Sequence, residues 1–290
     1  MQHGKYGNYF FGIIMLQLNK DKIKEFKKKG YTVIDKIFTT KEMNTLSLSV
    51  KNILKYRFKS LKNNNEQFNS INSKIDVLKY LPQLISKNDR NAFDHILDTI
   101  YQTPEFMRMV SKEKIQNIAN KLMNNNKDSP LYGYINKCRI NLPQDEIATL
   151  GWHREIFQTI PRSNFIQIWA PLFFNSTSKN GALQFCEGSH LVNFPKPKWT
   201  SNKNGTSKIV FNDENTHNFK KIEMNLKVGQ AVFFSGKLLH RSGNNISNLP
   251  RFSMVGLYHN IEDDNFIPPK AKFDYQGESP KDYFDSLSYY

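Results

Sequence analysis

The spacing of apolar residues in the first half of the chain predicts helices. A charged helix over residues 20–29 should end at Gly30, and the apolar run Tyr31–Ile34 that follows is typical of a short strand. Thr39 and Glu42 stand at the spacing of a capping box, which predicts that the next helix begins there. Apolar residues then recur at helical intervals and are expected to face the core: Met43, Leu46, Val50, Ile53 and Leu54.

Two more stretches have helical spacing, over about residues 74–101 and 104–123. The second begins after Thr103 and has Pro104 at its first helical position, where proline is well tolerated. We therefore expect a helical N-terminal part over about residues 16–125.

The pattern changes after the polar stretch Asn124–Pro130 to short runs rich in Ile, Phe, Trp and Val. Gly, Asn, Ser and Pro separate these runs, as expected for turns between strands. Many short strands over about residues 130–262 favour a barrel or jelly roll. The remainder, 263–290, is expected to be a C-terminal extension. The predicted strands are Tyr134–Asn141, Trp152–Phe157, Phe165–Leu172, Ala182–Cys186, Lys221–Leu226, Gln230–Phe234 and Phe252–His259.

The composition describes a globular protein with a large excess of positive charge. Hydrophobic residues make up 39% and aromatic residues 13%, which excludes a disordered or fibrous chain. A formal net charge of +15 is compatible with an anionic partner, which could be a small molecule, nucleic acid or an acidic membrane surface. The alternative is codon bias toward Lys, Asn and Ile, which would leave much of this charge on solvated surface.

Cysteine usage and the N-terminal residues bear on location. Cys138 and Cys186 are the two cysteines and form no disulfide framework, so reduced thiols and a cytoplasmic location are expected. The apolar stretch Tyr9–Leu16 is too short to cross a bilayer and has no cleavage pattern after it. We therefore expect no association with a membrane.

A His-x-Glu pair within a predicted strand is the first sign of chemistry. His153 and Glu155 are two residues apart, so on a strand both side chains would project from the same face. With a distant second histidine they would supply the three ligands of a 2-His-1-carboxylate iron site, which leaves coordination positions open for oxygen and an organic chelate. Taken alone the pair is a weak signal, because such pairs also arise by chance.

The segment Val228–Asn245 strengthens this interpretation. Its hydrophobic strand leads to His240, a polar turn follows, and Arg251 begins the next strand. A guanidinium can hold a carboxylate through two parallel hydrogen bonds, as the distal carboxylate of 2-oxoglutarate would require.

With these segments the sequence resembles the phytanoyl-CoA dioxygenase (PhyH-like) family of iron(II)/2-oxoglutarate oxygenases. The similarity covers about residues 20–260, and several linked motifs in order are more specific than any one of them. The matching segments are 26–34, Gly151–Glu155, Ile168–Leu172, Asn180–Leu183, Glu187–His190 and His240–Gly243, followed by Arg251.

The resemblance implies a single oxygenase domain over residues 1–290, mainly β, with a double-stranded β-helix (jelly roll, cupin-like) core and helices packed outside. It implies Fe(II), 2-oxoglutarate as co-substrate and O2, with His153, Glu155 and His240 as metal ligands and catalytic residues. Arg251 would anchor 2-oxoglutarate with help from Ser242. Asn141 would be a further contact to 2-oxoglutarate, and Trp169 a wall of the site.

Two departures from the family pattern stand out. Glu155 occupies a position where the family usually has Asp, and Glu187 precedes Gly188 where proline is frequent. His190 is expected to be a hydrogen-bonded structural residue, and Arg154 to point to the opposite face of the strand. His95, His217 and His259 have no partner motif and no assigned role.

The implied activity is hydroxylation of a small molecule, which the charge suggests is anionic, with release of succinate and CO2. One alternative is a non-catalytic jelly-roll binding protein descended from such an enzyme. It is disfavoured because all three ligands and the arginine are present. A nucleic-acid binder is a second alternative, but no basic stripe interleaved with aromatic residues supports it. The sequence does not identify the prime substrate or the oligomeric state, and it does not distinguish hydroxylation from desaturation.

Overall fold

The computed structural model describes residues 18–61, 76–145, 150–157, 159–160, 163–194, 199–201, 207–209 and 211–267. The apolar stretch Tyr9–Leu16 and most of the expected C-terminal extension lie outside these ranges. Within them, no helix combines the length and apolar composition that crossing a bilayer requires.

The N-terminal part is helical, as the apolar spacing predicts. Gly30 ends the first helix with a left-handed φ of 86°, which glycine adopts readily. The capping box is formed, because Thr39 N donates to Glu42 Oε2 at 2.8 Å and Glu42 N donates to Thr39 Oγ1 at 3.2 Å. The helices are α1 (Lys20–Lys29), α2 (Thr40–Leu61), α4 (Val77–Asn88), α5 (Arg90–Tyr101), α6 (Pro104–Val110) and α7 (Glu113–Met123).

Each of the two long helical stretches predicted from the sequence is divided in two. Asp89 is extended, with φ −155°, and its Oδ1 accepts a hydrogen bond from Ala92 N at 3.0 Å, so that it caps α5. The second break falls at Ser111 and Lys112, between α6 and α7. Apolar periodicity continues across both breaks because the helices on either side bury residues in one core.

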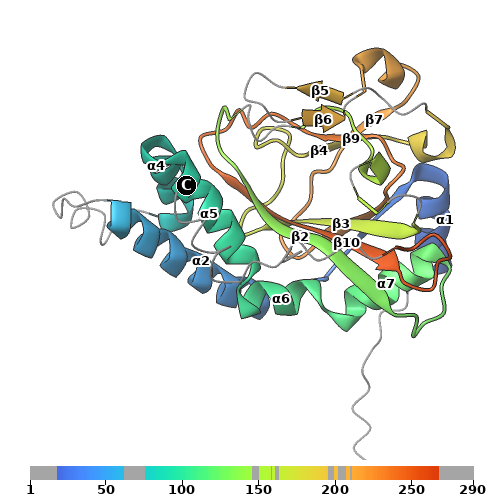
Figure 1. The fold of residues 1–290 in the computed structure, drawn as a ribbon, viewed down its shortest axis with the longest axis horizontal. Helices are drawn as coiled ribbons and strands as arrows, with labels where there is room; N and C mark the ends of the chain where they lie inside the picture. Colours follow the sequence, from blue (N-terminus) through green and yellow to red (C-terminus); the bar gives the residue numbers. More distant parts are fainter. Residues whose placement is uncertain are drawn as a thin grey trace, which may run out of the picture.

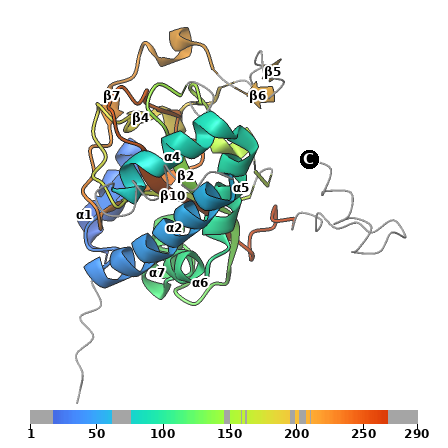
Figure 2. The same ribbon diagram turned by 90° about the vertical axis from the view of Figure 1, so that its left-hand side faces the viewer.

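Two antiparallel sheets form the β core. The larger has the strand order β1 (Tyr31–Ile34), β8 (Ala231–Ser235), β3 (Phe165–Leu172), β10 (Arg251–Asn260) and β2 (Leu131–Asn141). The smaller has the order β7 (Lys221–Glu223), β4 (Leu183–Cys186) and β9 (His240–Ser242). A separate ladder pairs β5 (Trp199–Ser201) with β6 (Ser207–Ile209). Figure 1 shows the smaller sheet on one side of β3 and β10, and Figure 2 shows α2, α4, α5 and α6 together on one face of the molecule.

This architecture confirms the predicted mainly β fold with helices packed outside a jelly-roll core. In the described part of the chain, no strand ladder joins the two sheets into a closed barrel. Short 3-10 helices interrupt the connections: η1 (Glu155–Phe157), η2 (Ser189–Leu191) and η3 (Asp213–Thr216).

The predicted strand Trp152–Phe157 is wrong. His153 makes a single bridge with His240, and the chain then turns into η1 at Glu155. The strands β5, β6 and β9 were not predicted, since three residues are too few to show an alternating pattern.

Strand alternation divides the larger sheet between two cores. On β3, Ile168 faces the helices, whereas Trp169 packs toward the smaller sheet. On β8, Phe233 likewise faces the helices and Phe234 packs toward the smaller sheet. The face of the larger sheet that the helices leave uncovered therefore meets the smaller sheet, and polar side chains of β3 and β10 on that face line a pocket.

Candidate active site

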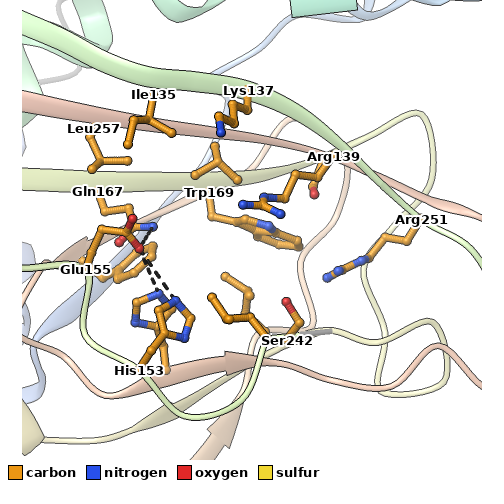
Figure 3. Close-up of a pocket in the computed structure, with 16 residues that line it drawn as sticks. Ile135, Lys137, Arg139, His153, Glu155, Gln167, Trp169, Ser242, Arg251 and Leu257 are labelled. Atoms are coloured by element: carbon orange, nitrogen blue, oxygen red, sulfur yellow. Dashed lines mark hydrogen bonds and ion pairs between the residues drawn. The ribbon is translucent and has the colours of Figure 1, made fainter. Parts of the chain in front are cut away.

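Three side chains that could hold a metal ion meet in this pocket. His153 precedes η1, Glu155 begins it, and His240 begins β9. One potential ligand atom from each residue lies within 4.8 Å of the other two. Nε2 of His153 is 3.7 Å, and Nε2 of His240 is 3.9 Å, from Glu155 Oε2 (Figure 3). The structure thus brings together the three residues that the sequence singled out as metal ligands.

Backbone hydrogen bonds hold the two histidines side by side. His153 N donates to His240 O at 2.9 Å, His240 N donates to His153 O at 3.1 Å, and the ring centroids are 4.0 Å apart. Nδ1 of His153 is 2.8 Å from Gly151 O, and Nδ1 of His240 is 2.9 Å from Leu238 O. A carbonyl oxygen only accepts, so each Nδ1 donates, and Nε2 is the ring nitrogen that remains available to bind a metal ion.

Burial keeps His240 neutral. Its ring is 3% exposed and lies edge-on to Phe185 and Phe234, with centroids 6.2 and 5.0 Å away. Burial, and then the charge of His153, lower the pKa of His240 to about 3. No proton therefore competes with a metal ion for Nε2 near neutral pH.

Glu155 is held as a carboxylate. Burial alone would raise its pKa, but the contacts with His153 and His240 and the charge of Arg139 outweigh burial and lower it. Gln167, on the central strand β3, donates from Nε2 to Glu155 Oε2 at 3.4 Å. Sequence reasoning missed Gln167 as a contact of this carboxylate. The available signal was a glutamine amid the apolar residues of β3.

The ligands converge by a different route from the one predicted. Since the chain turns at Glu155, strand alternation does not bring this side chain toward His153. Arg154 points away from both, as expected, but it is buried rather than solvated. Its guanidinium donates to Ser189 O and Val192 O and lies 4.4 Å from the ring centroid of Phe194. Arg154 thus attaches the ligand-bearing turn to the loop after β4.

Arg251 brings a buried positive charge to the other end of the pocket. It is 1% exposed, and its guanidinium lies 5.3 Å from the ring centroid of Trp169. Among the described residues, its Nε and Nη1 have no hydrogen-bond partner. Burial, and then the charge of Arg139, lower the pKa of Arg251 to about 9. Buried donors without partners are costly, which makes this position suited to an anionic ligand.

Of the four residues predicted to form the co-substrate site, three line the pocket, namely Arg251, Ser242 and Trp169 (Figure 3). Asn141 is buried opposite Arg251 in the β2–β10 ladder, and its carbonyl accepts from Asn245 Nδ2 at 3.0 Å. It is not among the pocket-lining residues. Its contact with 2-oxoglutarate therefore stays a prediction.

Strand β2 contributes residues to the pocket that the sequence did not assign, namely Ile135, Lys137 and Arg139. The register of β10 with β2 shifts between Val255 and Leu257, and Ile135 has a left-handed φ of 54°. This is a β-bulge, a feature that often redirects side chains beside active sites. A signal was present in Gly256 on the facing strand, where a Cβ would lie 2.6 Å from Asn136 Oδ1.

The other histidines in the described ranges are not among the pocket-lining residues. His190 is hydrogen-bonded as predicted, with Nε2 3.0 Å from Lys27 O. His259 is buried, with Nδ1 2.6 Å from Ser163 Oγ and Nε2 3.1 Å from Thr159 Oγ1. His95 and His217 are exposed.

Comparison with solved structures supports the fold. The carbocyclase SnoK from nogalamycin biosynthesis, a non-heme alpha-ketoglutarate-dependent protein, superposes with a TM-score of 0.58 at 15% identity, over 91% of this chain and 92% of that chain. EctD from S. alaskensis, crystallised with 2-oxoglutarate and 5-hydroxyectoine, gives a TM-score of 0.55 at 18% identity, over 89% and 80% of the two chains. The epimerase SnoN, in complex with Fe3+, alpha-ketoglutarate and nogalamycin RO, gives 0.55 at 14% identity, over 83% and 82%.

Comparison of the sequence with curated proteins found no match. The family model for phytanoyl-CoA dioxygenase (PhyH), in contrast, matches residues 26–253. That range includes the three residues whose ligand atoms cluster in the pocket as well as the buried Arg251. The chain therefore belongs to the phytanoyl-CoA dioxygenase (PhyH) family.

Proposed function

We propose that this protein is an Fe(II)/2-oxoglutarate-dependent dioxygenase that hydroxylates a small molecule and releases succinate and CO2. One observation carries the proposal. A His-Glu-His cluster with free Nε2 positions and a buried guanidinium without a partner among the described residues line the same pocket. Family membership and the cofactors of the similar structures SnoN and EctD support it.

The residues present fit an iron ion. Two metal bonds of about 2.1 Å can span at most about 4.2 Å. The separations from Glu155 Oε2 to the two Nε2 atoms, 3.7 and 3.9 Å, are within this limit. Two imidazoles and one carboxylate form the donor set typical of non-haem iron(II), which leaves positions for other ligands. We propose that His153, Glu155 and His240 hold the metal.

The pocket also fits 2-oxoglutarate. Arg251 faces the metal ligands across the pocket (Figure 3), so a dicarboxylate could reach both ends. The unpartnered Nε and Nη1 would receive its distal carboxylate. We propose that Ser242 adds a hydroxyl donor at this end and that Trp169 forms a wall beside the guanidinium.

Iron bound at this centre would supply the redox chemistry that couples oxidative decarboxylation of 2-oxoglutarate to hydroxylation of a second substrate. The protein's own residues orient and shield the reactants. Arg251 fixes one end of the co-substrate and thereby directs its keto-acid end toward the ligands. Apolar side chains such as Leu183, Phe234 and Leu257 line the remaining walls and limit access of water.

Release of succinate tests this function. Protein loaded anaerobically with Fe(II) is exposed to O2 and 2-oxoglutarate with each member of a panel of metabolites, and succinate and product masses are measured. We expect iron-dependent succinate release that one substrate class stimulates, with a product that has gained one oxygen atom. Absence of iron-dependent succinate release across the panel would contradict the proposal and favour a non-catalytic binding protein.

A further inference from the structure

A second arginine faces the same pocket at a different depth. Arg139 projects from β2, two residues after Lys137. Both side chains line the pocket above the metal ligands and Arg251 (Figure 3). Arg251 is 1% exposed, whereas Arg139 is an exposed residue. The pocket thus has one arginine at its closed end and another at its open side.

Arg139 influences both ends of the pocket. It lines the same pocket as Glu155 and Arg251, and its charge contributes to the lowered pKa of Arg251. It therefore lies within electrostatic range of both the metal ligands and the co-substrate anchor. A molecule placed between these two groups would lie beside the Arg139 guanidinium.

Among the residues that the structure describes, no ion-pair partner neutralises Arg139. Within the described ranges, its guanidinium forms no ion pair and no hydrogen bond, although arginines elsewhere have partners, such as Arg90 with Asp145 at 2.8 Å. Glu155 is the one carboxylate among the pocket-lining residues that the structure describes, and it belongs to the metal ligands. The two carboxylates of 2-oxoglutarate are already accounted for by the metal and Arg251, so neither requires Arg139.

We propose that Arg139 binds a negatively charged oxygen-bearing group, a carboxylate or a phosphate, of the prime substrate. This inference rests on the proposed function and names the chemical class of the molecule that is oxidised. Lys137, on the same side of the pocket, adds to the positive potential there. Because Arg139 is exposed, the pair would be partly solvated, and losing it should weaken binding about 10-fold.

Matched probes test this proposal. Protein loaded anaerobically with Fe(II) and 2-oxoglutarate is titrated with carboxylic acids that have aliphatic, aromatic and amino-acid skeletons. Each acid is compared with its primary amide and with the phosphate monoester of the alcohol that has the same skeleton. Binding is measured by calorimetry, and succinate release is then measured after O2 is admitted. The variants are Arg139→Gln and Arg139→Lys. The control is Arg108→Gln, which removes a 67% exposed arginine on α6.

We expect at least one acid or phosphate to bind more tightly than its amide and to stimulate succinate release. Arg139→Gln should remove this preference about 10-fold, Arg139→Lys should restore part of it, and Arg108→Gln should retain it. Comparison of the carboxylic acids with the phosphate monoesters shows which of the two anionic groups Arg139 binds. The proposal is overturned if no anion is preferred over its amide, or if Arg139→Gln changes the affinity for 2-oxoglutarate and leaves the preference intact. Wild-type protein that binds neither iron nor 2-oxoglutarate would instead refute the proposed function.

Discussion

Replacing Arg251 with methionine should weaken binding of 2-oxoglutarate and stabilise the ligand-free protein. Methionine retains an unbranched apolar chain beside Trp169 but removes the guanidinium. Loss of a charge-assisted bidentate pair costs about 2–4 kcal/mol, so the dissociation constant for 2-oxoglutarate should rise about 30- to 1,000-fold.

The stability effect has the opposite sign. Without a ligand, Nε and Nη1 of Arg251 are buried and have no partner among the described residues. The lowering of the pKa to about 9 reflects how unfavourable the buried charge is. Each buried unsatisfied donor costs about 1–3 kcal/mol, so the free energy of unfolding of the ligand-free variant should increase by about that amount or more.

Calorimetric titration with 2-oxoglutarate measures the change in affinity, and urea denaturation of the ligand-free protein measures the change in the free energy of unfolding. Iron content should be unchanged, since Arg251 is not a metal ligand in this account. Arg108→Met is the control, because Arg108 is exposed and paired with Glu105 at 2.9 Å, and it should alter neither quantity by more than about 0.5 kcal/mol. An unchanged affinity for 2-oxoglutarate would refute the reasoning. Destabilisation of the ligand-free protein would show that the guanidinium has partners that this account lacks.

Three further predictions concern residues around the metal ligands. Glu155→Asp should retain measurable turnover because both side chains present a carboxylate oxygen, whereas Glu155→Ala should lose hydroxylation. If Glu155→Ala releases succinate at the rate of the wild-type protein, Glu155 is not a ligand. Gln167→Leu removes the donor to Glu155 Oε2 and should weaken iron binding about 10- to 100-fold, as measured by chelator competition. An unchanged affinity for iron would show that Gln167 has no role in orienting the carboxylate. Burial lowers the pKa of His259 to about 4, so the folded state resists its protonation, and stability should fall by up to about 3 kcal/mol as the pH drops from about 6.5 to about 4. Urea denaturation of His259→Gln should show a shallower fall over this window, and equal slopes would contradict the assignment.

The fold could be predicted from the sequence where periodicity is strong and local. Helix α1, strand β1 and strand β3 have the predicted bounds because apolar spacing and terminating residues such as Gly30 determine them locally. The breaks at Asp89 and Ser111 were missed because the apolar pattern runs through them. The division of the chain into one domain with a C-terminal extension stays a prediction.

The candidate site was predicted from linked motifs, and its details were not. His153 and Glu155 were placed on a strand, but the chain turns at Glu155, and a local pattern of two residues cannot reveal that turn. On β2, Ile135, Lys137 and Arg139 follow strand alternation and line the pocket, but alternation alone does not show which face of a strand meets the pocket. Arg139 became a candidate only when the structure showed it beside both the metal ligands and Arg251.

Iron content with and without His240 tests the central claim most directly. Anaerobically prepared wild-type protein should bind one Fe(II) per chain, and His240→Ala should bind almost none, because the two remaining ligands hold the ion poorly. His217→Ala is the matched control, since His217 is exposed and outside the pocket, and it should bind iron like the wild type. Circular dichroism establishes that each variant is folded. Unchanged iron stoichiometry in folded His240→Ala would contradict the assignment of the metal centre.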